Sequence, residues 1–126
     1  GQGLVDLYIA LRQQQSLPAQ AVHSAAEISN WALKDQDAVA LAALNLFAGW
    51  LGSVAGDLVL TLGARGGVYL GGGIVPRWLG WFEHSAFKAR FTAKGRFAAY
   101  LKDVPVWVIN APDSPALWGA ARALTL

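Results

Sequence analysis

Residues 66–76 read GGVYLGGGIVP, and this stretch decides which fold the chain can adopt. Five of the eight positions 66–73 are glycine, a composition that costs conformational entropy and allows close approach to the backbone. The apolar residues 68–70 between the glycines predict a short buried strand. Pro76 suits the first turn of a helix. The stretch therefore predicts a strand, a turn over residues 71–73 and a helix.

A glycine-rich turn from a strand into a helix has the general form of a nucleotide-binding loop. Glycine lets a ligand touch the backbone, and the helix N-terminus offers free amides. The two best-known patterns are absent, because no Gly-x-x-x-x-Gly-Lys-[Ser/Thr] occurs and Pro76 stands at the last glycine of Gly-x-Gly-x-x-Gly. From the spacing alone, a bound ligand and tight packing of the chain against itself are equal alternatives.

Two helices are predicted in the N-terminal part of the chain. Apolar residues at helical spacing predict the first over residues 4–11. Ser24 and Glu27 have the spacing of a capping box and predict a short helix over residues 25–33. We therefore interpret Glu27 as a cap and not as a catalytic acid.

A long apolar segment follows Asp35 and Asp37, whose negative charges favour the start of a helix. The 19 residues 38–56 carry no charge, and the apolar run resumes after Asp57, which is long enough for a transmembrane helix. Alanine and glycine supply much of the apolar count, however, and no cluster of lysine or arginine flanks the segment. We therefore favour a central helix over a membrane span at residues 38–64.

In a soluble protein this central helix would be buried on most sides and would end near residues 62–63. Gly49, Gly52 and Gly56 would then lie on nearly one face, where another element packs against them. A fragment of a membrane protein spanning the bilayer at residues 38–64 is the alternative that this segment leaves open.

The C-terminal part of the chain predicts a second strand and a closing helix. Residues 104–109 have strand character, with Pro105 at the start as strands tolerate. Ser114 and Pro115 suit the N-cap and first residue of a helix that continues to Leu124. The order of helices and strands indicates an α/β fold, although two strands make a poor sheet.

The composition of the chain predicts one globular domain, because its 126 residues are 55% hydrophobic. The absence of cysteine excludes disulfides and thiolate metal sites. The start of the chain does not resemble a signal peptide, so we expect a cytoplasmic protein. The chain lacks methionine and begins Gly-Gln-Gly, from which we expect a piece of a longer protein.

Residues 77–103 combine basic and aromatic side chains, which can indicate a nucleic-acid surface. An aromatic residue at every third to fifth position is instead typical of the buried face of an amphipathic helix, with lysine and arginine on the solvated face. We favour this second interpretation and expect no nucleic-acid partner.

Candidate catalytic and metal-binding groups are weak throughout the chain. His23 precedes the capping serine, and His84 lies beside Glu83, an arrangement too local for a catalytic triad. Asp35 and Asp37 lack a third metal ligand nearby. We therefore expect no catalytic residue and no metal site in this chain.

Three motifs carry a resemblance to a known family. Residues 66–77, GGVYLGGGIVPR, resemble the adenosine motif Gly-Gly-Val-x-[Ile/Leu]-Ala-Gly-Gly-Ile-Val-Pro-Arg, and residues 94–97 are similar to Lys-Gly-Arg-Phe followed by a Pro-Val strand. Residues 3–8, GLVDLY, resemble Gly-Leu-Val-Asn-Leu-Tyr. The motifs occur in family order over essentially the whole chain. The chain thus resembles the bacterial glucokinases of the hexokinase, actin and Hsp70 ATPase superfamily.

The resemblance implies a fold and a nucleotide site. It implies the helix-rich C-terminal part of an actin-like ATPase (ribonuclease H-like) lobe with an incomplete sheet, divided into a helical region 1–63 and a region 64–126 with the adenosine motif. Gly71, Gly72 and Gly73 are then the residues that contact the adenosine of ATP. Two positions depart from the family pattern, because Gly71 replaces the usual alanine and Ala64 a common threonine.

The same resemblance implies that the chain is a C-terminal, adenosine-side fragment of an enzyme that uses ATP with Mg²⁺ to phosphorylate the 6-hydroxyl of glucose in glycolysis. The catalytic aspartate, the glucose ligands and the phosphate-binding hairpins would lie upstream. We expect the fragment to be inactive, to bind ATP weakly or not at all, and to self-associate through surfaces that the missing part covers. A non-catalytic, sugar-responsive regulator with the same ATPase fold is a further alternative.

Overall fold

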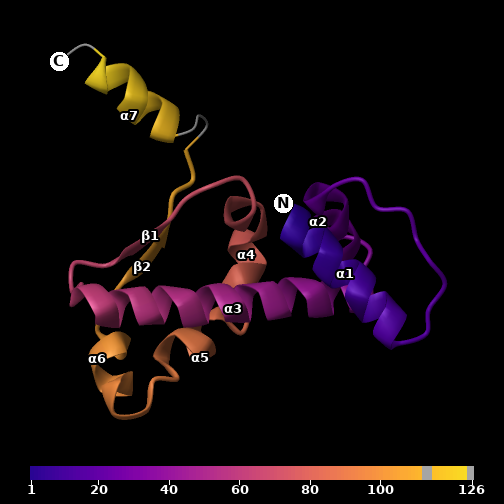
Figure 1. Ribbon diagram of the computed structural model, residues 1–126, viewed down its shortest axis with the longest axis horizontal. Helices are drawn as coiled ribbons and strands as arrows, with labels where there is room; N and C mark the ends of the chain where they lie inside the picture. The colour runs from indigo at the N-terminus through magenta and orange to yellow at the C-terminus, as the bar shows by residue number, and fades with distance from the viewer. Residues whose placement is uncertain (112–114, 125–126) are drawn as a thin grey trace.

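The computed structural model describes residues 1–111 and 115–124. Along the chain it shows helices, a strand, short helices, a second strand and a final helix, as predicted (Figure 1). The elements are α1 (Gln2–Gln14), α2 (Ala25–Leu33), α3 (Ala38–Leu62), β1 (Val68–Leu70), η1 (Val75–Trp78), α4 (Leu79–Phe82), α5 (Phe87–Thr92), η2 (Gly95–Phe97), α6 (Ala98–Lys102), β2 (Val106–Val108) and α7 (Pro115–Ala123).

The N-terminal helices α1 and α2 pack on one end of α3 (Figure 1). The Ser24 side chain accepts a hydrogen bond from the amide of Glu27 at 3.3 Å, and the Glu27 carboxylate accepts one from the amide of His23 at 2.8 Å. These bonds satisfy amides that a helix start otherwise leaves unpaired. The prediction that Glu27 is a cap is confirmed.

Helix α3 is the central element of the molecule, and α5 crosses it at close range (Figure 1). Asp37 caps its first turn by accepting from the amide of Ala40 at 2.6 Å. A Cβ atom built on Gly52 would overlap the carbonyl oxygen of Phe87, and one on Gly56 would lie 2.5 Å from that of Phe91. Only glycine lets the two backbones approach this closely, which confirms the predicted contact face.

The polar residue inside the apolar segment of α3 also has a role in this crossing. The Asn45 side-chain oxygen accepts a hydrogen bond from the amide of Ala86 at 2.8 Å. Ala86 is the N-cap residue of α5 and offers no side-chain cap of its own. The long helix thus caps the short helix that crosses it.

One side of α3 is more exposed than we predicted from its composition. Only 44% of the most apolar 18-residue stretch of this helix is buried. Exposed apolar side chains recur along it at every fourth residue. These residues form an exposed stripe: Leu46, Trp50, Val54, Leu58 and Leu62. Residues four apart lie on one helix face, so burial is one-sided, and the prediction of burial on most sides was wrong. Among the described residues, α3 is the one helix whose length and hydropathy would suit a membrane span, and core helices of soluble proteins share both properties.

Strands β1 and β2 form a parallel pair in which Val68 lies opposite Val106 and Leu70 opposite Val108. The middle residues, Tyr69 and Trp107, lie on the other face, where their rings stack with centroids 4.8 Å apart. Tyr69 is 64% exposed, so the prediction of a wholly buried strand was wrong at this residue. Alternate strand residues point to opposite faces, and only one face of this pair is covered.

The segment 77–103 folds as several short helices, and most of its aromatic side chains are buried while its basic side chains lie at or near the surface. Trp78, Phe82, Phe87 and Phe91 belong to the core. Phe97 departs from the expected pattern, because it is 45% exposed and lies against the guanidinium of Arg96.

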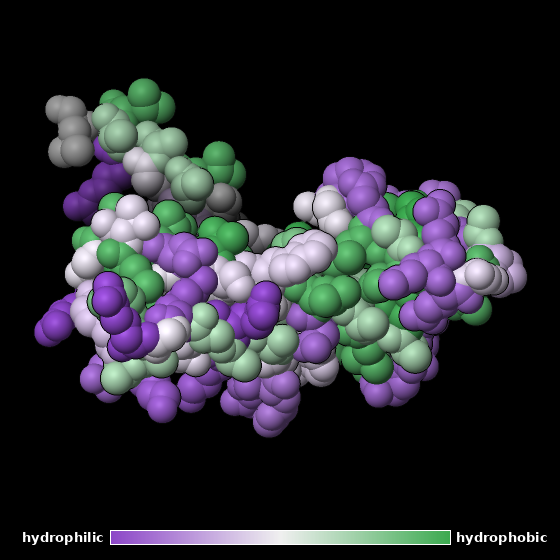
Figure 2. Space-filling model, turned by 60° about the horizontal axis from the view of Figure 1, so that its bottom comes forward, coloured by the Kyte–Doolittle hydropathy of each residue, from purple (hydrophilic) through white to green (hydrophobic). Residues whose placement is uncertain are grey.

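The final helix, α7, projects from the rest of the molecule beyond the end of β2 (Figure 1). Every described residue of this helix is exposed, Leu117 and Trp118 by 71% and 68%. Figure 2 shows hydrophobic residues on the surface of this projecting helix at the upper left. The predicted Ser114 cap lies outside the described residues.

Candidate functional site

The glycine turn, residues 71–73, lies at the carboxyl edge of the parallel strand pair. Leu70 ends β1 immediately before the turn, and its carbonyl oxygen accepts a hydrogen bond from the amide of Ile109 at 2.9 Å. Because the strands are parallel, the segments that follow both of them leave from the same edge. In open α/β sheets this edge is where ligands bind.

The three glycines differ in what their positions require. Gly72 has a φ of +108°, in the region that side chains rarely adopt. A Cβ on Gly71 would lie 3.7 Å from Cδ1 of Ile109, an ordinary contact, so the alanine that is usual in the resembling motif fits the same backbone. A Cβ on Gly73 would meet no atom within 4 Å. All three are exposed, so the backbone of the turn is open to a ligand.

The exit of the glycine turn is fixed by the two residues that end η1. The Arg77 Nε donates to the carbonyl oxygen of Gly73 at 3.0 Å. Trp78 is 1% exposed, and its indole Nε1 donates to the hydroxyl of Ser29 on α2 at 2.9 Å. The sequence pattern did not reveal the bond between Trp78 and Ser29, because these residues are 49 positions apart in the chain.

Gly67, in the first glycine pair of residues 66–76, packs against another part of the same chain. Gly67 has a φ of +122°, and a Cβ there would overlap Cζ3 of the Trp107 ring and lie 3.0 Å from the carbonyl oxygen of Pro105. What approaches the backbone at this point is therefore an indole of the same chain. The two alternatives from the sequence therefore apply to different glycines. Gly67 packs against the chain itself, while the backbone of residues 71–73 is open.

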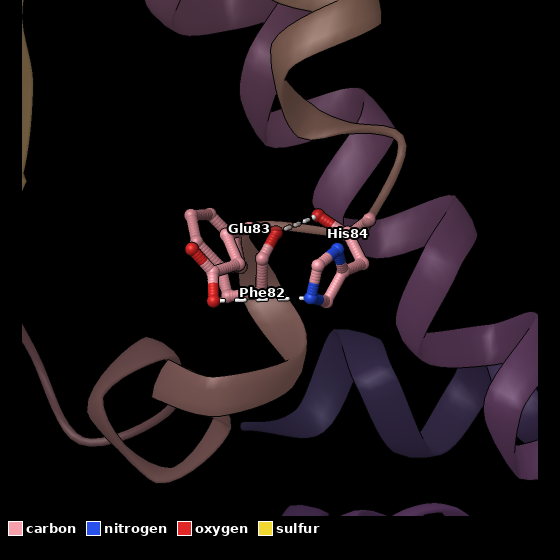
Figure 3. Close-up of polar contacts among 4 residues, drawn as sticks. Phe82, Glu83 and His84 are labelled. Carbon is pink, nitrogen blue, oxygen red and sulfur yellow. Dashed lines mark hydrogen bonds and ion pairs between the residues drawn. The ribbon is translucent and has the colours of Figure 1, made fainter.

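The contact between His84 and Glu83 is local and exposed. His84 and Glu83 are neighbours with 3.8 Å between Nε2 and Oε1, and both side chains are more than 70% exposed. Figure 3 shows this contact at the turn after Phe82 as a dashed line between the two side chains. Among residues 1–111 and 115–124, no three histidine, aspartate or glutamate side chains gather as a metal site would need.

Comparison with known proteins identifies the family of this chain. A family model described as Glucokinase matches residues 1–126. The chain belongs to the glucokinase family. The glucokinase of Cupriavidus metallidurans is 48% identical over 98% of this chain, and that of Aromatoleum aromaticum is 52% identical over 98%. The glucokinase of Chromobacterium violaceum is 56% identical over 79% of it.

A solved glucokinase structure has the same fold as this chain. The crystal structure of a glucokinase from an Antarctic psychrotroph matches 99% of the chain with a TM-score of 0.81 and 42% identity. At this identity and score the predicted fold class, a helix-rich partial α/β lobe of the ATPase type, is confirmed.

The glucokinases extend well beyond the region that this chain matches. The chain spans 37% of the length of the first two relatives and 38% of the solved glucokinase. The family assignment therefore covers residues 1–126, which correspond to just over a third of these glucokinases.

Proposed function

We propose that this chain is the C-terminal, adenosine-side part of an ATP-dependent glucokinase that phosphorylates the 6-hydroxyl of glucose in glycolysis. The family match over residues 1–126 supports the activity of the intact enzyme. The observation that supports the role of this part is the open backbone at Gly72 and Gly73, at the carboxyl edge of the strand pair. A cytoplasmic location follows from the same proposal, since ATP and glucose phosphorylation belong to that compartment.

In this proposal Gly71, Gly72 and Gly73 lie against the adenine and ribose of ATP. The turn suits a flat base and its sugar, because these three residues are exposed and have no side chains of their own to cover the backbone. Helix-start amides and glycine backbones are the groups that nucleotides meet most closely in such turns. A side chain at position 73 would point into this space.

The remaining parts of the reaction belong to sequence beyond this chain. The described residues offer no carboxylate cluster for Mg²⁺, so the metal would be held by the ATP phosphates and the rest of the enzyme. Phosphoryl transfer depends on positioning and on stabilisation of developing charge. The chain alone should therefore show no kinase activity, and its affinity for ATP should be weak without the phosphate contacts.

A chimera tests the proposed function. This chain replaces the segment that it matches in the glucokinase of Cupriavidus metallidurans, and ATP-dependent phosphorylation of glucose is measured. We expect an active enzyme in which Gly73→Val raises the KM for ATP about tenfold or more and leaves the KM for glucose unchanged, since a loss of about 1.4 kcal/mol in binding free energy gives a factor of ten.

The matched control is Gly80→Val on α4, another position where a Cβ meets no atom within 4 Å. Its KM for ATP should equal that of the unmodified chimera. A folded chimera without activity would contradict the glucokinase assignment and favour the non-catalytic regulator. An active chimera with an unchanged KM for ATP in Gly73→Val would remove the glycine turn from the site.

We also propose that the isolated chain self-associates. The exposed stripe on α3 and the stacked rings of Tyr69 and Trp107 leave apolar side chains exposed on the long helix and on the strand pair. Patches of this kind are usually covered in soluble proteins. Light scattering should report a mass above the 13.4 kDa of one chain, and a monodisperse monomer would contradict this proposal.

A further inference from the structure

The hydroxyl of Ser29 joins α2 to η1, the segment that follows the glycine turn. Ser29 is 6% exposed, and its Oγ donates to the carbonyl oxygen of Ala25 at 2.8 Å. The same Oγ accepts from the Trp78 Nε1 at 2.9 Å. The hydroxyl thus satisfies the only hydrogen bond that an indole can donate.

Trp78 is held from a second side by aromatic contacts. Its ring meets Phe47 of α3 edge to face at a centroid distance of 5.7 Å and Trp81 at 6.0 Å. These contacts fill the space around the ring, whereas the hydrogen bond to Ser29 is directional and fixes the rotation of the indole. The end of η1 is therefore anchored to both α2 and α3.

The glycine turn itself has little packing of its own. A Cβ at position 72 or 73 would meet no atom of the described residues within 4 Å, so the backbone is not packed on that side. The path of the turn is set at its entry by the Leu70–Ile109 hydrogen bond and at its exit by Arg77 and Trp78. A change at either anchor should move the open backbone.

We propose that Ser29 is a positioning residue of the nucleotide site, acting through Trp78 on the glycine turn. The assignment of a nucleotide to this turn rests on the function proposed above. Ser29 bonds to Ala25 and Trp78, and its effect is to hold the end of η1, and through it the exit of the turn, in one position. Because α2 carries Ser29, the N-terminal helices contribute to the site without lining it.

Amide hydrogen exchange of the 126-residue chain tests the positioning directly. Trp78→Phe removes the indole N–H and leaves Ser29 bonded to Ala25, so it breaks the link without burying an unpaired donor. We expect the amides of residues 73–75 and 77 to exchange at least threefold faster, with a smaller change in α3. Ser29→Ala should have the same effect, and the double variant should add little to either single one.

The matched control is Ser85→Ala, which removes another buried serine hydroxyl that both donates and accepts. It should leave the ratio of exchange between the amides of residues 73–75 and 77 and those of α3 unchanged. Ser29→Thr retains the hydroxyl and should restore slow exchange. Equal acceleration in the turn and α3, or no acceleration in either, would overturn the proposal, since the link would then act on overall stability or not at all.

The chimera gives a second, independent measurement. Ser29→Ala should raise its KM for ATP about three- to tenfold and leave kcat and the KM for glucose unchanged, whereas Ser85→Ala should change none of these. A fall in kcat with an unchanged KM for ATP would contradict a positioning role. If the unmodified chimera is inactive, the proposed function fails, and the exchange measurements still decide whether Ser29 positions the turn.

Discussion

Glycines are buried where α3 and α5 cross, but they are exposed in the glycine turn and in α7. In the α3–α5 crossing, Gly52 and Gly56 are buried beneath the backbone of α5. At the glycine turn and in α7, Gly73 and Gly119 are exposed and have no atom within 4 Å of a built Cβ. The first pair is required by this chain's own fold, whereas the second leaves backbone free for contacts outside it.

The largest expected effect comes from exchanging one buried and one exposed glycine for valine. Gly52→Val should lower the free energy of unfolding by about 3 kcal/mol or more, because the new side chain must displace the backbone of Phe87. Gly119→Val on α7 should change it by less than about 0.5 kcal/mol, since the position is open. Urea unfolding followed by circular dichroism measures both.

Similar losses of unfolding free energy in Gly52→Val and Gly119→Val would mean that the two positions are equally packed in solution. A stable Gly52→Val protein would show that α5 can move away from α3 at low cost. Either result would contradict the contrast between the buried and the exposed glycines.

The next effect concerns Gly67, which precedes β1 and lies against the ring of Trp107. Gly67→Ala should cost about 2 kcal/mol, because the position combines a φ of +122° with overlap of the Trp107 ring. Adding Trp107→Ala should recover part of the loss, since only the backbone strain then remains. Urea unfolding of the two single variants and the double variant measures this coupling.

The control is Gly66→Ala, where a Cβ meets no atom within 4 Å, and its stability should stay within about 0.5 kcal/mol of the unmodified chain. Strictly additive effects of Gly67→Ala and Trp107→Ala would show that the Trp107 ring is not the reason why position 67 requires glycine. Gly67 would then be required by its backbone conformation alone.

Local patterns predicted the elements of this fold well, because their causes lie within a few residues. The capping pair Ser24 and Glu27, the cap at Asp37 and the strand at residues 68–70 all follow from neighbours in sequence. The face formed by Gly49, Gly52 and Gly56 followed from helical spacing alone. The glycine turn of the candidate site was predicted in the same way, with ligand and packing left as alternatives.

The contacts that could not be predicted join residues far apart in the sequence. Asn45 capping α5, Trp107 lying on Gly67 and Ser29 bonding to Trp78 each depend on how distant elements pack. The exposure of Tyr69 and of one side of α3 was missed for a related reason, because apolar composition does not say whether a partner is present. An isolated polar residue in an apolar segment, such as Asn45, was the one available signal.

The smallest expected effect is the removal of α7. A chain ending at Ala111 should unfold with a free energy within about 0.5 kcal/mol of the original, because every described residue of α7 is exposed. A helix of nine residues is also too short to be stable without packing, so its own contribution is small. Urea unfolding of the two chains at equal concentration measures the difference.

A loss above about 1.5 kcal/mol would show that α7 packs against an apolar surface in solution. If the loss grows with protein concentration, that surface belongs to a second copy, since only association makes stability depend on concentration.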